Sequence, residues 1–284
     1  MVRPVALPQV VRTRADLREA LAVVRRPIGL VPTMGALHEG HASLIRKAHA
    51  DNATVLVTIF VNPRQFNDSA DFEKDPRDEA SDVRVCGAAG ATMVFIPPVD
   101  EMYPDGFQTS VRVGALAEPL EGAARPGHFE GVTTVVSILL TLAGANRAYF
   151  GQKDAQQLLV IRRMVADLGL ATEIVACPIL REPDGLAMSS RNVRLTSEQR
   201  AAAPILRRAL SAARARYDAG ERDAELLRAT MRVTLSAEPL AAAEYVSCAD
   251  TATLHELDRV TGPALLSMAV RFGAVRLIDN EPLP

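Results

Sequence analysis

The chain has 284 residues, of which 48% are hydrophobic and 23% charged, with a formal net charge of −2 at pH 7. This is enough chain for one large or two modest domains. The slightly negative charge, with no basic tail, argues against nucleic acid as the main partner. The longest apolar stretch, residues 132–145, is interrupted by Thr and Ser and is too short to span a bilayer. Three scattered cysteines and an N-terminus without a continuous apolar run predict a soluble, cytoplasmic protein.

Strand-like and helix-like segments alternate through about the first 180 residues. Strands are predicted over residues 28–31, 54–60, 92–96, 147–150 and 172–177. Amphipathic stretches between them predict helices near residues 41–52, 78–89, 131–143 and 154–168. Short β-branched runs separated by such helices predict an α/β fold, with a parallel sheet covered on both faces. In such sheets ligands bind beyond the carboxyl ends of the strands.

The pattern changes after about residue 180. Thr196-Ser-Glu-Gln199 fits a capping box and opens an Ala/Arg-rich helix expected to end near Gly220. A second helix is predicted over residues 223–235, followed by strands over 244–248, 264–271 and 274–278. We therefore expect a Rossmann-like domain over residues 1–179 and a smaller α+β lid domain over residues 180–284.

The most informative stretch is His38-Glu39-Gly40-His41, which follows the strand of residues 28–31 and a small-residue turn and begins a helix. Two imidazoles three residues apart lie on one face of a helix's first turn. There the unpaired backbone N–H groups and the helix dipole favour an anion, and Gly40 lets a ligand approach the backbone. The stretch is interpreted as a site for the phosphates of a nucleotide. A zinc site is the alternative, but the i, i+4 spacing of metalloprotease histidines and any Cys-x-x-Cys pair are both missing.

Two further segments carry polar residues that suit a small polar substrate. Asn62 and Gln65 follow the strand of residues 54–60, and amide side chains both donate to and accept from hydroxyls and carboxylates. Arg125-Pro-Gly-His128 precedes the helix of residues 131–143. Taken alone, the first segment could be a polar turn and His128 a helix-start residue.

A third segment, Gly151-Gln-Lys-Asp154, leaves a strand and starts a helix. Gly151 lets a ligand approach the backbone, Lys153 can reach phosphate, and Asp154 can cap the helix or hold a ribose hydroxyl. Of the 32 basic residues only Lys47, Lys74 and Lys153 are lysines. Lysine is a compact point charge suited to phosphate, so its use at residue 153 hints at a chemical reason.

The fourth segment, Met188-Ser-Ser-Arg191, places two hydroxyls beside a guanidinium between the two expected domains. Small donors with one Arg suit a polyphosphate whose charge grows as its leaving group departs. A Ser-rich linker is the alternative interpretation.

Together, five segments in order closely resemble the pantoate–β-alanine ligase family. They are Pro32-Thr-Met-Gly-Ala-Leu-His-Glu-Gly-His41, Phe60-Val-Asn-Pro63, Arg125-Pro-Gly-His-Phe129, Phe150-Gly-Gln-Lys-Asp154 and Asp184-Gly-Leu-Ala-Met-Ser-Ser-Arg-Asn192, and the resemblance extends to Arg276-Leu-Ile-Asp-Asn280. This family belongs to the nucleotidyltransferases related to class I aminoacyl-tRNA synthetases. The resemblance implies that pantoate attacks ATP to form pantoyl adenylate, which β-alanine then converts to pantothenate and AMP.

The resemblance also implies roles for individual residues, a homodimer, and Mg²⁺ that arrives with ATP and is held mainly by phosphate oxygens and water. Catalytic roles fall to His38 (the proton donor), His41, Lys153, Ser189, Ser190 and Arg191. The ATP site would comprise Met34, Gly35, Ala36, Leu37, His38, Glu39, Gly40, His41, Gly151, Gln152, Lys153, Asp154, Leu180, Met188, Ser189, Ser190 and Arg191. Substrate contacts fall to Asn62, Gln65, Arg125, His128 and Gln157, and Asp82 is the candidate carboxylate for Mg²⁺.

The chain departs from the family pattern at three places. Asp75-Pro-Arg77 replaces a segment that usually reads Tyr-Pro-Arg, Arg64 occupies a position that is more often apolar, and Gln152 occupies one where Glu is commoner. None of these removes a residue that the chemistry needs.

One competing interpretation is a related nucleotidyltransferase with a phosphate acceptor, which would not need paired Gln65 and Gln157. A non-catalytic nucleotide sensor would be expected to lack His38, Lys153 or the Ser-Ser-Arg segment. A serine hydrolase is disfavoured because no Gly-x-Ser-x-Gly elbow is present.

Overall fold

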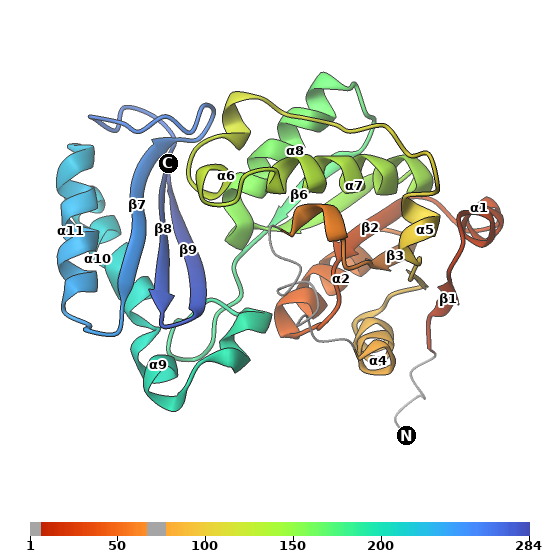
Figure 1. Ribbon diagram of the computed structural model, residues 1–284, viewed down its shortest axis with the longest axis horizontal. Coiled ribbons are helices and arrows are strands. Elements are labelled where there is room, and N and C mark those ends of the chain that lie inside the picture. The colour runs from red at the N-terminus through yellow and green to blue at the C-terminus, as the bar shows by residue number, and fades with distance from the viewer. Residues whose placement is uncertain (1–6, 67–77) are drawn as a thin grey trace. The chain divides into compact units, whose positions relative to one another are not determined.

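The computed structural model of the protein describes residues 7–66 and 78–284 (Figure 1). The Asp75-Pro76-Arg77 departure lies outside the described residues. The chain forms two compact units: one runs to Gln152 and continues over Gln156–Pro178, and the other comprises Lys153–Ala155 and Ile179–Pro284. The second unit therefore includes a short piece from the middle of the sequence.

The first unit is built on a six-stranded sheet in the order β1-β4-β3-β2-β5-β6, and every pairing in it is parallel. The strands are β1 (Gln9–Val11), β2 (Ile28–Thr33), β3 (Thr54–Ile59), β4 (Met93–Phe95), β5 (Arg147–Gly151) and β6 (Glu173–Cys177). Central β3 is buried along its whole length, because its apolar run is covered on both faces. The predicted parallel, Rossmann-like sheet is confirmed.

Helices cover both faces of this sheet (Figure 1). Val31 and Val57 pack in one apolar cluster with α2 (Glu39–Asp51) and α4 (Glu79–Ala89). Their neighbours Leu30 and Leu56 pack in another cluster, because successive side chains of a strand point to opposite faces. That second cluster includes side chains from α1 (Arg14–Ala22), α7 (His128–Ala143) and α8 (Ala155–Asp167). Two short helices, α5 (Val99–Met102) and α6 (Glu121–Ala124), complete the described helices of this unit.

The second unit contains a three-stranded antiparallel sheet in the order β7-β8-β9, which confirms the α+β prediction. The strands are β7 (Ala242–Asp250), β8 (Ala264–Phe272) and β9 (Val275–Leu283), and the last two meet at Gly273, whose φ is 58°. Apolar side chains of α10 (Ile205–Asp218) and α11 (Ala224–Ser236) form one core with this sheet.

The helix predicted to open at Thr196 is two helices, α9 (Ser197–Ala202) and α10. The capping box is present: Gln199 N donates to Thr196 Oγ1 at 3.3 Å, and Thr196 N donates to Gln199 Oε1 at 3.1 Å. The break falls at Pro204, which has no backbone N–H for a helical hydrogen bond and starts a new helix instead.

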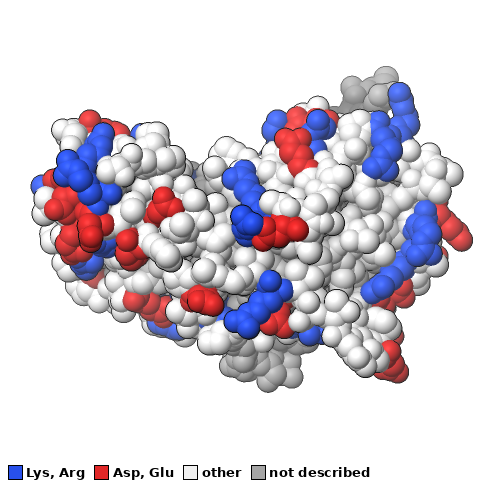
Figure 2. Space-filling view, turned by 90° about the horizontal axis from the view of Figure 1, so that it is seen from above, with Lys and Arg blue, Asp and Glu red and all other residues white. Residues whose placement is uncertain are grey.

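Basic and acidic side chains lie next to one another on the face of each unit shown in Figure 2. In the second unit, for example, Arg228 pairs with Glu225 and Glu256. Within residues 7–66 and 78–284, no helix is both long enough and apolar enough to cross a membrane.

Candidate functional site

The turn that leaves β2 has an unusual backbone conformation. Gly35 and Ala36 both have positive φ, 89° and 49°, which is uncommon for a residue with a Cβ such as Ala36. This conformation directs the N–H groups of Ala36 and Leu37 at the carboxylate of Asp82 on α4, with N···O distances of 3.0 and 2.8 Å. A buried carboxylate from another element therefore fixes the turn that leads into His38.

Asp82 is 4% exposed. Burial raises the pKa of its carboxyl group, and the hydrogen bonds from Leu37 and Ala36 only partly offset this effect. An ionised carboxylate has about four lone-pair sites, of which these two N–H groups use two. The observed contacts give Asp82 a positioning role, and the remaining lone pairs are chemically suited to Mg²⁺ or its bound water.

His38 and His41 cap the start of α2 reciprocally. Gly40 N donates to His38 Nδ1 at 3.1 Å, His38 N donates to His41 Nδ1 at 3.3 Å, and the ring centroids lie 4.2 Å apart. Because both Nδ1 atoms accept hydrogen bonds, the neutral tautomers place the ring protons on Nε2. Two Nε2–H donors beside a helix N-terminus are suited to phosphate oxygens.

The amide loop after β3 is also tied together. It contains a 3₁₀ turn, η1 (Pro63–Gln65). Asn62 Nδ2 donates to Gln65 Oε1 and to Gly131 O, both at 3.1 Å. Gln65 Nε2 lies 2.9 Å from Met34 Sδ, so the amide donor of Gln65 faces the turn before His38. The Asn62 side chain thereby sets which end of the Gln65 amide faces Met34.

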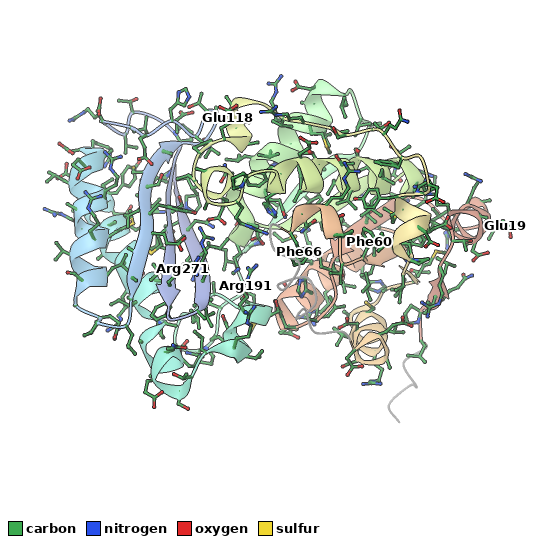
Figure 3. The ribbon with its side chains drawn as sticks, viewed as in Figure 1. Glu19, Phe60, Phe66, Glu118, Arg191 and Arg271 are labelled. Carbon is green, nitrogen blue, oxygen red and sulfur yellow. The ribbon has the colours of Figure 1, made fainter. Side chains whose placement is uncertain are left out.

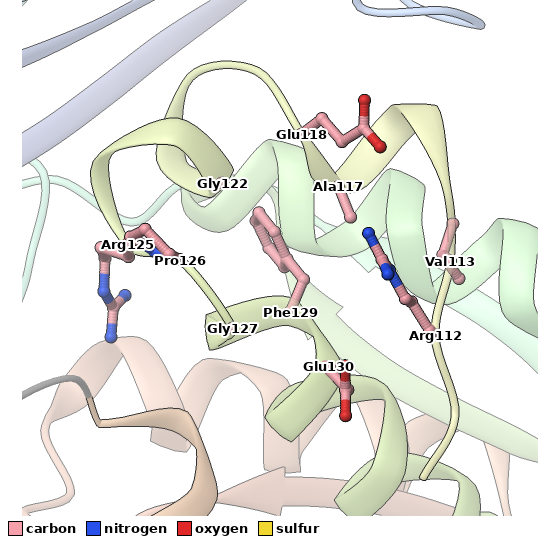
Figure 4. Close-up of a pocket in the computed structure, with 10 residues that line it drawn as sticks. All are labelled: Arg112, Val113, Ala117, Glu118, Gly122, Arg125, Pro126, Gly127, Phe129 and Glu130. Atoms are coloured by element: carbon pink, nitrogen blue, oxygen red, sulfur yellow. The ribbon is translucent and has the colours of Figure 1, made fainter.

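Arg125 and His128 hold the backbone of the same loop. Arg125 Nη2 donates to Gln65 O at 3.2 Å, and His128 Nδ1 lies 3.0 Å from that oxygen. His128 is the first residue of α7, close to Arg125, which also lines a pocket of about 270 Å³ beside Phe129 (Figure 4). Gly131 is required here, since a Cβ would lie 2.3 Å from Arg64 O.

Tyr103 is a member of this cluster that the sequence did not indicate. Burial raises the pKa of Tyr103 to about 12, so its hydroxyl stays protonated and donates to Asn62 Oδ1 at 2.8 Å. The Arg64 guanidinium lies 5.3 Å from the ring centroids of both Tyr103 and Phe107, a cation–π arrangement. Arg64, a departure from the family pattern, is thus accommodated by aromatic rings on a distant segment. Phe60 and Phe66 flank the loop (Figure 3).

Lys153, Asp154, Leu180 and the Met188–Arg191 segment belong to the second unit, whereas Gly151, Gln152 and Gln157 belong to the first. The 3₁₀ turn η3 (Gln152–Asp154) follows Gly151, the last residue of β5. Leu180 and Met188 are joined by a hydrogen bond from Met188 N to Leu180 O at 3.0 Å, which closes a hairpin.

The Ser-Ser-Arg segment follows that hairpin directly. Ser189 Oγ accepts from Arg191 N at 3.2 Å and caps the 3₁₀ helix η4 (Ser190–Arg194). The Arg191 side chain is exposed and is labelled in Figure 3.

The structure brings most first-half candidates into one cluster: residues 34–41, Asn62, Gln65, Arg125 and His128. Gln157 lies on α8 and is half-buried. Its neighbour Gln156 is 5% exposed and bonds three backbone groups near α6, so Gln156 has a structural role. Among residues 7–66 and 78–284, no cluster of three or more His, Cys, Asp or Glu side chains could hold a metal ion.

A parallel sheet covered on both faces, with paired histidines capping the helix after a central strand, defines an α/β protein of the class that binds ligands beyond the carboxyl ends of its strands. The family within that class follows from comparison. The model of the pantoate-beta-alanine ligase family matches residues 9–282, and the chain belongs to this family.

Individual relatives agree with this assignment. The chain is 59% identical over 272 residues to the pantothenate synthetase of Roseiflexus sp. (strain RS-1), covering 96% of this chain and 98% of that protein. The crystal structure of pantothenate synthetase from Thermus thermophilus matches with a TM-score of 0.91 and 45% identity, over 96% of this chain and 98% of the other. The ligase of Francisella tularensis, complexed with beta-gamma ATP and beta-alanine, matches with a TM-score of 0.78 and 34% identity, over 96% and 97%.

Proposed function

We propose that this chain catalyses the ATP-dependent condensation of pantoate with β-alanine to pantothenate, AMP and pyrophosphate. The observation that carries the proposal is the pair of reciprocally capping imidazoles, His38 and His41, in a chain of the pantoate–β-alanine ligase family. The relative from Francisella tularensis, which was solved in complex with beta-gamma ATP and beta-alanine, supports ATP and β-alanine as ligands.

The reaction proceeds in two steps. A carboxylate oxygen of pantoate attacks the α-phosphorus of ATP, and the bond to pyrophosphate breaks. The β-alanine nitrogen then attacks the acyl carbon of pantoyl adenylate, AMP leaves, and the amine loses a proton. Charge grows on the phosphate oxygens in the first step, where Nε2–H donors from His38 and His41 stabilise it.

The segments of the second unit act on the same phosphates in this proposal. Lys153 supplies a compact positive charge, while Ser189, Ser190 and Arg191 supply donors. Residues 34–41 together with Gly151, Gln152, Asp154, Leu180 and Met188 complete the nucleotide site. Residues 1–179 then form the domain that binds nucleotide and pantoate, and residues 180–284 form the lid.

The amide loop binds the acceptor. Asn62 occupies Gln65 Oε1 and one N–H of Gln65 Nε2 points at Met34 Sδ, so the second N–H is the donor for a carboxylate or hydroxyl of pantoate. Gln157 is the second pantoate ligand, and Gln65 also lies near the β-alanine site. Arg125 and His128 contribute by holding Gln65 O.

Mg²⁺, a homodimer and a cytoplasmic location complete the proposal. Mg²⁺ binds chiefly through phosphate oxygens and water, which agrees with a site to which Asp82 offers a carboxylate. The family resemblance supports the dimer, and light scattering of the purified chain would test it.

A nucleotidyltransferase with a phosphate acceptor is the alternative. It is disfavoured by the family match over residues 9–282, and it gives no reason for an amide such as Gln65 to be held by Asn62, Arg125 and His128.

The testing experiment measures pyrophosphate and AMP release from Mg-ATP with pantoate, with and without β-alanine. We expect about one equivalent of pyrophosphate per enzyme without the amine, and steady AMP formation with it. Absence of pantoate-dependent pyrophosphate, in protein shown to bind ATP, would reject the proposed acceptor.

A further inference from the structure

Two successive residues of β9, Asp279 and Asn280, are polar yet 2% and 4% exposed. Successive residues of a strand point to opposite faces of its sheet. Asn280 bonds a proposed catalytic residue, Lys153, and Asp279 bonds Arg181 in the hairpin that leads into the Ser-Ser-Arg segment. Nothing in the proposed chemistry requires polar side chains at these two positions, so their contacts call for an explanation.

Asn280 is joined to the catalytic lysine segment. Its Nδ2 donates to the backbone oxygen of Lys153 at 2.9 Å, across 127 positions of sequence. Residues 153–155 belong with the second unit. The Lys153 side chain has four rotatable bonds, so the location of its backbone decides where the ammonium group can reach.

Asp279 is joined to the hairpin that leads into the Ser-Ser-Arg segment. Arg181 donates to both Asp279 carboxylate oxygens at 2.7 and 3.0 Å, and also to Gly185 O at 3.0 Å. The Asp279 side chain is 1% exposed and that of Arg181 19%, and a bidentate pair of this kind fixes orientation as well as distance. The hairpin closes at Met188, one residue before Ser189.

We propose that Asn280 is a positioning residue for Lys153, and that Asp279 does the same for the Ser189–Arg191 segment from the adjacent position of the same strand. β9 thereby holds the backbone of Lys153 and the hairpin that leads into Ser189 from two adjacent positions of one strand. This inference rests on the proposed function, because it takes Lys153 as the residue that neutralises the ATP phosphates.

The test replaces the donor of Asn280 and leaves its surroundings in place. Asn280→Asp keeps the shape but presents a carboxylate to the Lys153 carbonyl, and two acceptors cannot bond. Asn280→Ala removes the amide without burying a charge, and covers the case in which the Asp variant fails to fold. A small displacement of a catalytic group can cost about 100-fold in rate. We expect both variants to lose roughly 10- to 100-fold in kcat for pantoate-dependent pyrophosphate release, with the KM for pantoate changed by less than about 2-fold.

Ser267→Ala is the matched control. Ser267 lies opposite Asn280 on β8 and is also buried, and no hydrogen-bond partner for its hydroxyl occurs among the described residues. We expect this variant to keep the wild-type kcat.

The readout specific to positioning is a double-mutant cycle with Lys153→Ala. If Asn280 acts through Lys153, Asn280→Ala causes no further loss in the Lys153→Ala background, because residues that act as a unit are non-additive. Wild-type kcat in folded Asn280→Ala, or the same fold loss in both backgrounds, would overturn the inference. Near-normal turnover of Lys153→Ala alone would instead overturn the role of Lys153 in the proposed function.

Discussion

The two segments that we propose to contact phosphate are built differently. The His-Glu-Gly-His segment of the first unit follows a turn with two positive φ angles, which the buried carboxylate of Asp82 holds in place. Within the segment, His38 and His41 cap the helix start reciprocally. The Ser-Ser-Arg segment of the second unit is a 3₁₀ helix with no buried residue and one side-chain cap, from Ser189.

The first segment is therefore preformed, whereas the second has a conformation that can adapt to a ligand. Part-buried hydrogen bonds hold the imidazoles in one geometry before any ligand arrives, which favours electrostatic stabilisation without reorganisation. The hairpin before the serine segment is held by Asp279 through Arg181, but the 3₁₀ helix that follows has no buried residue to restrain its donors. Mutations in or against the first segment should therefore change the placement of the imidazoles and slow the reaction. Mutations near the second segment should have smaller and more local effects.

The largest effect is expected from His38→Ala. It removes the Nε2–H donor and the N-cap acceptor together, and we expect adenylate formation to slow by about 10²- to 10⁴-fold in single-turnover pyrophosphate release. His38→Asn is the control, because Asn is a strong N-cap residue and keeps the helix start without an imidazole. It should restore thermal stability and not activity. A His38→Asn enzyme with near-normal turnover would show that His38 only caps the helix.

A smaller effect is expected from Asp82→Asn. The amide offers one acceptor where two backbone N–H groups now converge, so the turn should shift and kcat/KM for ATP fall roughly 10-fold. Asp78→Asn, which keeps the cap of α4, is the control. The Mg²⁺ concentration for half-maximal rate should be unchanged if Asp82 only positions the turn, and should rise if it also binds the metal ion.

The smallest effect is expected from Asp184→Asn in the second unit. This half-exposed pair with Arg200 should contribute at most about 1 kcal/mol to the free energy of unfolding. Arg200 lowers the pKa of Asp184, so the contribution is present at neutral pH and lost as pH falls through the folded-state pKa. Chemical unfolding should thus show a small deficit for the variant at pH 7 that disappears in acid. An unchanged deficit in acid would mean that Asp184 acts by another route.

Asp82 provides the opposite case. Its folded-state pKa is raised by burial, so its ionisation costs folding free energy at neutral pH, and that cost disappears as pH falls below the unfolded value. The two carboxylates should therefore change stability with pH in opposite directions.

The sequence predicted five of the six parallel strands and the three antiparallel ones, because their apolar runs are long and bounded by turn residues. It did not indicate β1 or α1. β1 is a three-residue edge strand, and α1 has one buried residue, Leu17, so hydrophobic periodicity is weak in both.

The candidate site was predictable where its residues are neighbours in sequence, as in residues 38–41. It was not predictable where partners come from distant segments, such as Asp82 with Leu37 or Asn280 with Lys153. The positive φ of Ala36 has no sequence signal either, since it depends on the tertiary contact with Asp82.

Because Lys153–Ala155 belongs to the second unit, this enzyme cannot be divided into its two units by a single cut in the chain. A fragment that begins at Ile179 would contain Asn280 and the serine segment but not the lysine whose carbonyl Asn280 binds. A chimera that exchanges C-terminal halves between family members would join a lysine segment from one parent to a β9 from another. For such a swap to preserve the native contacts, residues 153–155 must travel with the C-terminal half.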